Sequence, residues 1–161
     1  MTKHQIVPAG LEHALQLAPR LRKGDLAEIK AASGMEPEDA LVLSLAMAPK
    51  SWAWLYKGRV MAVFGVSPHP YRDGVGVPWL LAANIGRHKT YFVRQSRRYV
   101  AEMLAEFPVL ENYVDCRNTA SIQWLHWCGF ALAEVVPFYG VQRLPFIRFF
   151  AARSQEQCAT P

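Results

Sequence analysis

Carboxylate and phenol side chains that could transfer protons lie in the last third of the chain. Asp115, Glu111 and Glu134 flank or occupy expected strands, and alternation along a strand puts Asp115 on the same side as Tyr113. A carboxylate beside a substrate can accept a proton, so Asp115 is the candidate general base. An ion pair between Asp115 and Arg117 or Arg143 is the competing interpretation.

A basic stretch is the second group of residues that could do chemistry. Five cations occur between positions 87 and 98 with no acidic residue among them: Arg87, Lys89, Arg94, Arg97 and Arg98. Such side chains can bind the phosphates of a cofactor or of a nucleic acid, and they can also form a solvated helix face. The five Trp recur at core-like positions away from this stretch, which argues against nucleic-acid binding.

The cysteines and histidines indicate no metal site. Cys116, Cys128 and Cys158 have no regular spacing, and the five His are scattered. Cys116 has no His at a spacing that would support a nucleophile, so we expect it to be a small buried apolar residue.

The composition is that of one folded domain. The chain has 161 residues, of which 52% are hydrophobic and 19% charged. We expect a single domain over 1–152 and a loose tail over 153–161. The N-terminus lacks the apolar core of a signal peptide, and the stretch ALVLSLAMA is too short to span a membrane, so a soluble protein is expected.

The elements that must position these residues follow from periodicity and turn signals. A short strand and a set of helices open the chain, with Leu26 and Ile29 in one helix and Pro37 at the start of another. The later pattern predicts, in chain order, a hairpin (52–56 with 60–64), a buried strand (77–83) and a basic helix (90–107). A strand (112–116), a short helix (118–129) and two final strands (131–136 and 146–151) follow. A strand-helix-strand unit between hairpins predicts a mixed sheet in an α+β fold.

The stretch NTASIQWLHWCGF, residues 118–130, predicts a helix with a defined start and stop. Asn118 is a good N-cap, because its side-chain oxygen can accept from the amide near Ser121. Gly129 suits the left-handed position after the helix, which would fold Phe130 back on Leu125. The motif is therefore sufficient to form structure without any chemical role.

The same motif, Asn-x-x-Ser-x-x-Trp-Leu-x-x-x-Gly-Phe, resembles the fourth-helix motif of the GCN5-related N-acetyltransferase (GNAT) superfamily, and the order of elements is that of the superfamily. Within it, the segments VPWLLA, RHKTYFVRQSRRYV and LENYVDCRNTASIQWLHWCGF most resemble the internal virion protein A group of short-tailed phages. The resemblance implies an acyl-CoA N-acyltransferase fold: a mixed, mostly antiparallel central sheet with helices on both faces.

The resemblance also implies acetyl-CoA as a cofactor and a set of residues that would bind it. The pyrophosphate would lie on the backbone amides of a glycine-rich turn that opens the central helix. Here that turn has one glycine and bulky cationic neighbours, so phosphate binding would rely on side chains. The candidate cofactor-binding residues are Leu81, Ala82, Ala83, Gly86, Arg87, His88, Lys89, Thr90 and Asn118.

The proton donor of the superfamily is missing from its usual place. Many GNAT enzymes carry a Tyr seven residues after the motif's Asn, whereas this chain has Leu125 there. Tyr139 and Tyr113 are the nearest phenols in sequence, and Tyr139 is the candidate acid. Strand 77–83 has no ionisable group to serve as a base, which leaves Asp115.

Three function classes remain open. The first is a phage-type accessory or virion protein with degenerate acetyltransferase motifs, in the host cytoplasm and the virion, with other virion proteins or a host protein as partners. The second is an active acetyl-CoA-dependent N-acetyltransferase of a protein or small amine, and the third is a nucleic-acid binder. A slot between splayed central strands would favour the second, and an apolar plug would favour the first.

Overall fold

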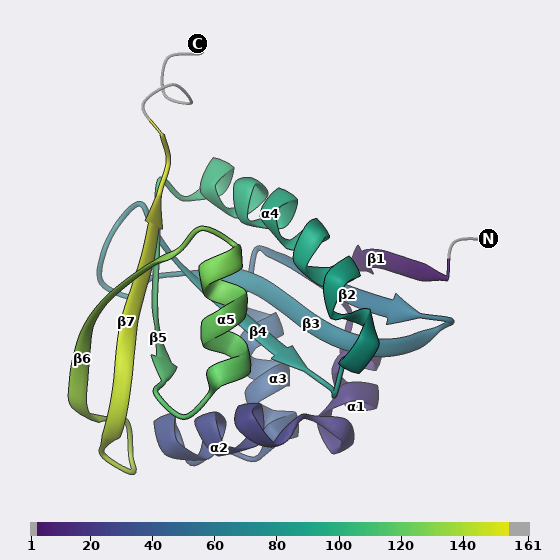
Figure 1. The fold of residues 1–161 in the computed structure, drawn as a ribbon, viewed down its shortest axis with the longest axis horizontal. Coiled ribbons are helices and arrows are strands. Elements are labelled where there is room, and N and C mark those ends of the chain that lie inside the picture. The colour runs from purple at the N-terminus through teal and green to yellow at the C-terminus, as the bar shows by residue number, and fades with distance from the viewer. Residues whose placement is uncertain (1–2, 155–161) are drawn as a thin grey trace.

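The computed structural model describes residues 3–154 as seven strands, five α-helices and two short 3₁₀ helices (Figure 1). In chain order they are β1 (His4–Pro8), α1 (Leu11–Leu17), η1 (Ala18–Arg20), α2 (Lys23–Ala32), α3 (Pro37–Met47), β2 (Lys50–Tyr56), β3 (Arg59–Pro68), β4 (Val75–Ala82), η2 (Gly86–His88), α4 (Lys89–Glu106), β5 (Val109–Asp115), α5 (Thr119–Trp127), β6 (Ala131–Tyr139) and β7 (Leu144–Ala152). This order is the one that the sequence predicts.

The strands form one mixed sheet in the order β1-β2-β3-β4-β5-β7-β6. Only β4 and β5 pair in parallel, and every other neighbouring pair is antiparallel. The predicted hairpin is β2–β3, whose turn places Lys57 at φ 50° and Gly58 at φ 80°. The predicted α+β class with a mixed sheet is confirmed.

Helices cover both faces of the sheet and divide the core into two layers (Figure 1). One layer contains Phe92 and Met103 of α4 with Trp124 and Leu125 of α5. The other contains Ala14 and Leu17 of α1, Ile29 of α2 and Leu41 of α3. The side chains on each layer come from alternate positions of the central strands, so both faces of those strands are buried.

The 118–130 motif folds as predicted. The side chain of Asn118 accepts from the amide of Ser121 at 3.4 Å, and Gly129 has φ 87°. The amide of Phe130 donates to the carbonyl of Leu125 at 3.1 Å, and both side chains are buried. One expectation is wrong: Trp127 does not lie in the core, because it is at the end of α5 with 55% of its surface exposed.

The two central strands separate soon after they meet. The parallel pairing of β4 with β5 covers only Val75 with Val109 and Gly76 with Leu110. Beyond these residues the strands diverge, and we call the space between them the central gap. A splayed centre is the arrangement expected for a cofactor slot.

The C-terminal boundary differs from the expectation at its first residue. Arg153, expected in the loose tail, donates its amide to the carbonyl of Pro108 at 2.8 Å and its guanidinium to that of Leu104 at 2.7 Å. Residues 155–161 of that expected segment lie outside the described residues. Within residues 3–154, no helix has the length and apolarity needed to cross a bilayer.

The β6–β7 turn holds the end of the sheet against α2. The amides of Val141 and Gln142 donate to the carbonyls of Ala32 and Ala31 at 3.2 and 3.1 Å. Gly140, at φ 69°, permits this approach, since a Cβ there would lie 2.5 Å from the carbonyl oxygen of Ala31. The contact places Tyr139, the last residue of β6, close to α2.

We predict that Gly140→Ala destabilises the fold more than Gly129→Ala. Both residues have a positive φ, but a Cβ at Gly129 would meet no atom within 4 Å. Gly129→Ala should therefore show only the left-handed strain of roughly 1–2 kcal/mol. Gly140→Ala should lose roughly a further 1–3 kcal/mol through the clash with α2. Urea unfolding of the two variants tests this, and equal losses would contradict the docking role of the turn.

Candidate active site between the diverging central strands

The central gap exposes backbone groups that a regular ladder would pair. Successive residues of a strand direct their backbone groups alternately to the two neighbouring strands. Ala83, at the end of β4, donates its amide to Met61 of β3 at 2.9 Å. The even-numbered residues Pro78, Leu80 and Ala82 therefore direct their backbone groups toward β5. Buried backbone groups need partners. The partners found in the gap come largely from side chains and from the segment before α2.

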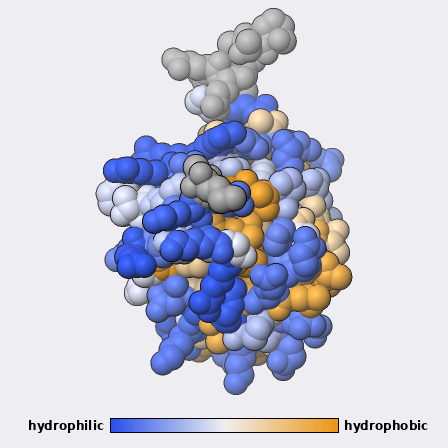
Figure 2. Space-filling model, turned by 90° about the vertical axis from the view of Figure 1, so that its right-hand side faces the viewer, coloured by the Kyte–Doolittle hydropathy of each residue, from blue (hydrophilic) through white to orange (hydrophobic). Residues whose placement is uncertain are grey.

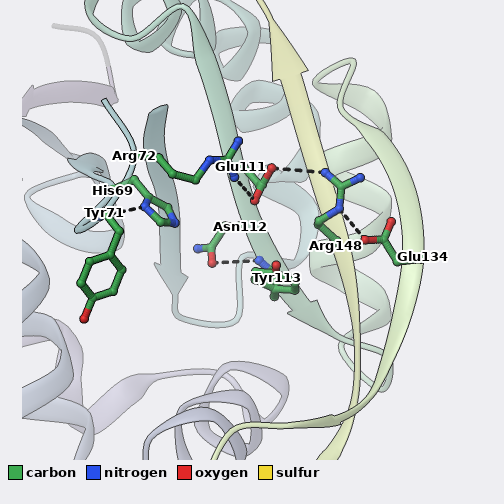
Figure 3. Close-up of polar contacts among 8 residues, drawn as sticks. All are labelled: His69, Tyr71, Arg72, Glu111, Asn112, Tyr113, Glu134 and Arg148. Atoms are coloured by element: carbon green, nitrogen blue, oxygen red, sulfur yellow. Dashed lines mark hydrogen bonds and ion pairs between the residues drawn. The ribbon is translucent and has the colours of Figure 1, made fainter. Parts of the chain in front are cut away.

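Asn112 of β5 spans the part of the gap nearest the paired residues (Figure 3). Its side-chain Nδ2 donates to the carbonyl of Pro78 at 2.8 Å, and its Oδ1 accepts from the amide of Tyr113 at 2.8 Å. One amide side chain thus supplies a hydrogen bond between the two strands just beyond the point where their ladder ends.

The start of α2 closes the other end of the gap. Asp25 accepts from the amide of Ala82 at 2.9 Å, and the backbone amide of Arg22 donates to the carbonyl of Ala82 at 2.9 Å. Asp25 is fully buried and also accepts from Arg22 Nε at 2.9 Å and Asn118 Nδ2 at 3.1 Å. Arg22 in turn donates to the hydroxyl of Ser121 at 2.8 Å. This cluster fixes α2, β4 and α5 to one another.

Glu28 lies one turn further along α2 and reaches the other strand. Its Oε1 accepts from the amide of Asp115 at 2.7 Å. Burial is the main cause that raises the pKa of Glu28 to about 7, and the nearby carboxylates of Asp25 and Asp115 raise it further. Hydrogen bonds from the Asp115 amide and the Asn118 side chain lower the pKa and offset part of this rise. Near neutral pH, Glu28 is therefore a carboxyl group that can both accept and release a proton.

Glu28 lines a cavity of about 260 Å³ that we call the large cavity. Residues from both faces of the sheet line it, including Met35 and Leu43 near α2–α3 and Trp124 and Leu125 of α5. The large cavity therefore extends through the central gap.

Two stacked phenols line the same cavity. The rings of Tyr113 and Tyr139 lie 4.8 Å apart, and Tyr139 also contacts the ring of Phe146 at 4.5 Å. Burial raises the pKa of Tyr139, with smaller contributions from Tyr113 and Glu28, so this phenol keeps its proton at neutral pH.

A second cavity of about 140 Å³, the small cavity, lies on the α4–α5 side of the sheet. Its walls include Arg22, Ala82 and Lys89, and it shares Leu80 and Trp124 with the large cavity. The backbone of Leu80 thus stands where the two cavities adjoin. We call the two adjoining cavities together the passage, since they share these walls and lie between the N-terminal end of α4 and Glu28.

The turn before α4 uses several of its own amides. The amides of Gly86 and His88 donate to Asn84 Oδ1 and the Ile85 carbonyl at 3.3 and 2.9 Å, and the Lys89 amide donates to the Gly86 carbonyl. These amides are directed into the turn, as the single glycine suggests. Arg87 and Lys89 are exposed, and Lys89 Nζ donates to Gln123 at 3.1 Å.

Figure 2 views the molecule from the β1 side, where hydrophilic residues cover most of the surface.

The candidate cofactor-binding residues occupy different surroundings. Leu81 lines the large cavity, Ala82 and Lys89 line the small one, and Gly86, Arg87 and Thr90 are exposed. Ala83 packs in the α1–α3 layer. The ring of His88 lies 4.1 Å from Tyr56 and 5.3 Å from His4.

Asn118 differs from the expectation of a cofactor ligand. It is buried, and both ends of its amide bond protein groups, Ser121 and Asp25. In this structure it positions the start of α5.

The predicted base, Asp115, is placed in an ion pair instead. Its carboxylate accepts from Arg117 Nη2 at 2.7 Å and Nε at 3.1 Å. Although burial opposes the change, these hydrogen bonds and the charge of Arg117 lower the pKa of Asp115. A carboxylate with a lowered pKa and a bound guanidinium is a poor proton acceptor at neutral pH, so the structure favours the competing interpretation, an ion pair with Arg117, over a role of Asp115 as base.

Sequence reasoning missed Glu28. The segment KGDLAEIK puts Asp25 and Glu28 three residues apart, on one face of a helix, but such a pair usually faces solvent. Only the packing of α2 over the central gap distinguishes these two carboxyls from surface acids.

A chain of ion pairs runs across the sheet beside the site (Figure 3). Glu111 of β5 binds Arg72 of the β3–β4 loop at 2.9 Å and Arg148 of β7 at 3.2 Å, and Arg148 binds Glu134 of β6 at 2.7 Å. Glu111 and Tyr113 alternate onto the same face of β5. The chain therefore ties together the elements that surround Tyr113.

We predict that Asp25→Ala costs roughly 3–5 kcal/mol of unfolding free energy, because it leaves Arg22 and the Ala82 amide without their buried acceptor. Glu134→Ala is the matched control, since it also removes an Arg partner but from a side chain that is 61% exposed. Urea unfolding should show a much smaller loss for the control. Similar losses would show that the Asp25 cluster does not hold the gap together.

We predict that Glu28→Gln stabilises the protein above neutral pH. A carboxyl whose folded-state pKa is raised stabilises the fold at low pH, and that contribution is lost as the pH rises through about 7. Gln keeps an acceptor for the Asp115 amide without the charge. The variant should match the native protein near pH 4 and exceed it by on the order of 2 kcal/mol at pH 8 in urea unfolding. A pH-independent difference would contradict the raised pKa.

The sequence matches no protein-family model and no curated protein. The structure, however, resembles solved acetyltransferases over nearly its whole length. An N-acetyltransferase from Staphylococcus aureus Mu50 superposes with a TM-score of 0.74 at 14% identity, covering 94% of this chain and 99% of the other. A GNAT superfamily phosphinothricin acetyltransferase from Sinorhizobium meliloti, solved with acetyl-CoA, gives 0.70 at 12%, covering 99% and 94%.

A ribosomal-protein-S5-alanine acetyltransferase from Vibrio fischeri gives a TM-score of 0.67 at 12% identity, with 96% of each chain covered. At such identities the likeness establishes the fold alone. The chain has the GNAT acyl-CoA N-acyltransferase fold.

Proposed function

We propose that the protein is an acetyl-CoA-dependent N-acetyltransferase whose general base is Glu28. The observation that carries this proposal is the passage through the central gap, which has cationic side chains at one end and a carboxyl of pKa about 7 at the other. A degenerate scaffold would not need these adjoining cavities, nor a part-buried carboxyl that titrates near neutrality.

The residues along the passage fit acetyl-CoA. The free edge of β4 at Leu80 offers a backbone amide and carbonyl between the two cavities, and apolar walls from Phe92, Val93 and Trp124 suit an alkyl arm. Lys89 and Arg87 would hold the phosphates through their side chains, because the turn amides are directed inward. When bound, the cofactor supplies an activated acetyl thioester that an amine can attack.

Glu28 would take the proton from the attacking amine. As the new N–C bond forms and the C–S bond of the bound thioester breaks, one N–H proton would pass to the Glu28 carboxylate, and a proton donor of the protein would supply the proton that the departing sulfur gains. The Asp115 amide orients the carboxyl through the 2.7 Å hydrogen bond to Oε1. The raised pKa makes Glu28 a stronger base than an exposed carboxylate.

Tyr139 is the proton donor that we assign to the leaving group. It keeps its proton because burial raises its pKa, and it lines the same cavity as Glu28. Leu125, buried and without a polar group, packs at the position where the superfamily commonly has its Tyr. The donor would thus come from β6 instead of α5.

A second candidate is a GNAT-fold protein that has lost its chemistry, such as a phage virion or accessory protein that binds other virion proteins or a host protein. Leu125 and the inward-bonded turn favour it. In this case the passage would bind no acetyl-CoA.

We predict micromolar binding of acetyl-CoA by calorimetry, with release of free CoA thiol when an amine is added. Activity should rise with pH through about 7 as Glu28 ionises. Glu28→Gln should lower kcat by roughly 10²–10⁴-fold while the Kd for acetyl-CoA stays unchanged. Glu134→Gln, which changes a carboxyl outside the passage, serves as the control.

The outcomes separate the two candidates. Absence of acetyl-CoA binding would remove the enzyme proposal and favour the scaffold. Thiol release that persists undiminished in Glu28→Gln would keep the enzyme and remove Glu28 as its base.

A further inference from the structure

We infer that the acceptor of this site is a small amine with a single positive charge and an apolar, preferably aromatic body. The inference rests on the proposed function, because it concerns the side of the passage that holds Glu28. It follows from the chemistry of the walls of the large cavity.

Aromatic and aliphatic side chains form most of those walls. Trp79, Tyr113, Tyr139 and Phe146 come from four different strands, and Met35 and Leu43 come from the segment around the α2–α3 connection. Aromatic walls bind flat apolar groups through large contact areas, and they also favour an ammonium group near their faces. Leu43 is 49% exposed, so the apolar lining continues to the surface.

The charges in the large cavity exclude most other amines. Among the described residues that line it, Glu28 is the only carboxyl, and there is no Lys, Arg or His. A substrate carboxylate or phosphate would enter without a cationic partner, and the second ammonium of a polyamine would find no second carboxylate. Burying an unpaired charge is costly, so these substrates are disfavoured.

The size of the large cavity favours a small molecule. Its volume of about 260 Å³ must also accommodate the acetyl end of the cofactor, and small-ligand sites span ~300–1,000 Å³. A phenyl ring on a short alkyl amine suits the remaining space. A protein acceptor would have to insert a lysine side chain or its N-terminal residue past the same apolar entrance.

We predict that 2-phenylethylamine is preferred over phenylalanine and spermidine by at least tenfold in kcat/KM, measured as CoA thiol release. Phenylalanine has the same body with an added carboxylate, so that comparison isolates the negative charge. Spermidine differs both in its additional ammonium groups and in lacking the ring, so that comparison tests the two properties together. Calorimetry of each amine, with and without CoA, provides a readout that does not depend on turnover.

Leu43→Asp tests the same inference through the protein. It adds a second carboxylate at the entrance and should shift the preference toward spermidine by tenfold or more. Leu26→Asp is the matched control, because Leu26 is also an exposed Leu, at 37%, but does not line the large cavity. It should leave the preference unchanged.

The two proposals fail in different ways. Binding of 2-phenylethylamine without thiol release would overturn the enzyme and support the inferred specificity of the cavity. Thiol release that favours spermidine or phenylalanine would overturn the specificity and support the enzyme. Acetylation of an unstructured lysine peptide but not of 2-phenylethylamine would identify a protein acceptor and overturn the inference. If no amine binds or reacts, both are overturned.

Discussion

The separation of β4 from β5 is the constraint on which the rest of this structure depends. A parallel pair that ends after two residues leaves amides and carbonyls unpaired in the middle of a seven-stranded sheet. Unpaired backbone groups in a core are costly. Asn112, Asp25, Arg22 and Glu28 supply the partners, and between them they keep the central gap open. The opening exists because side chains and the backbone amide of Arg22, and not a neighbouring strand, complete the hydrogen bonding.

The same partners set the electrostatics of the site. Asp25 and Glu28 lie on one face of α2. Asp25 accepts hydrogen bonds from three donors, one of which is a guanidinium. The hydrogen bond that holds Glu28 to β5, in contrast, comes from a single backbone amide. Burial and the neighbouring carboxylates therefore raise the pKa of Glu28 to about 7. A group that destabilises the folded state in its charged form is the kind expected at a site of proton transfer. Asp115, paired with Arg117, is the contrasting case of a carboxyl used for structure.

The two ends of the passage offer different groups to a ligand. At the α4 end, the turn directs amides inward and presents Arg87 and Lys89, so phosphate recognition would shift from backbone to side chains. At the α2–α3 end, Leu125 contributes no proton donor, and Tyr113 and Tyr139 stand across the large cavity. The fold persists at 12–14% identity to these structural neighbours.

The sequence by itself determined the elements whose signals are local. Asn118 and Gly129 mark the ends of α5, Lys57 and Gly58 mark the hairpin turn, and alternation marks the central strands, because each depends on residues a few positions apart. The sequence could not assign the carboxyls. Glu28 meets Asp115 from 87 positions away, and Asp25 meets Ala82 from 57. Which acid is paired and which has a raised pKa depends on burial and on partners that only the tertiary structure brings together, and for that reason the sequence could not distinguish Asp115, which is paired with Arg117, from Glu28, whose pKa is raised.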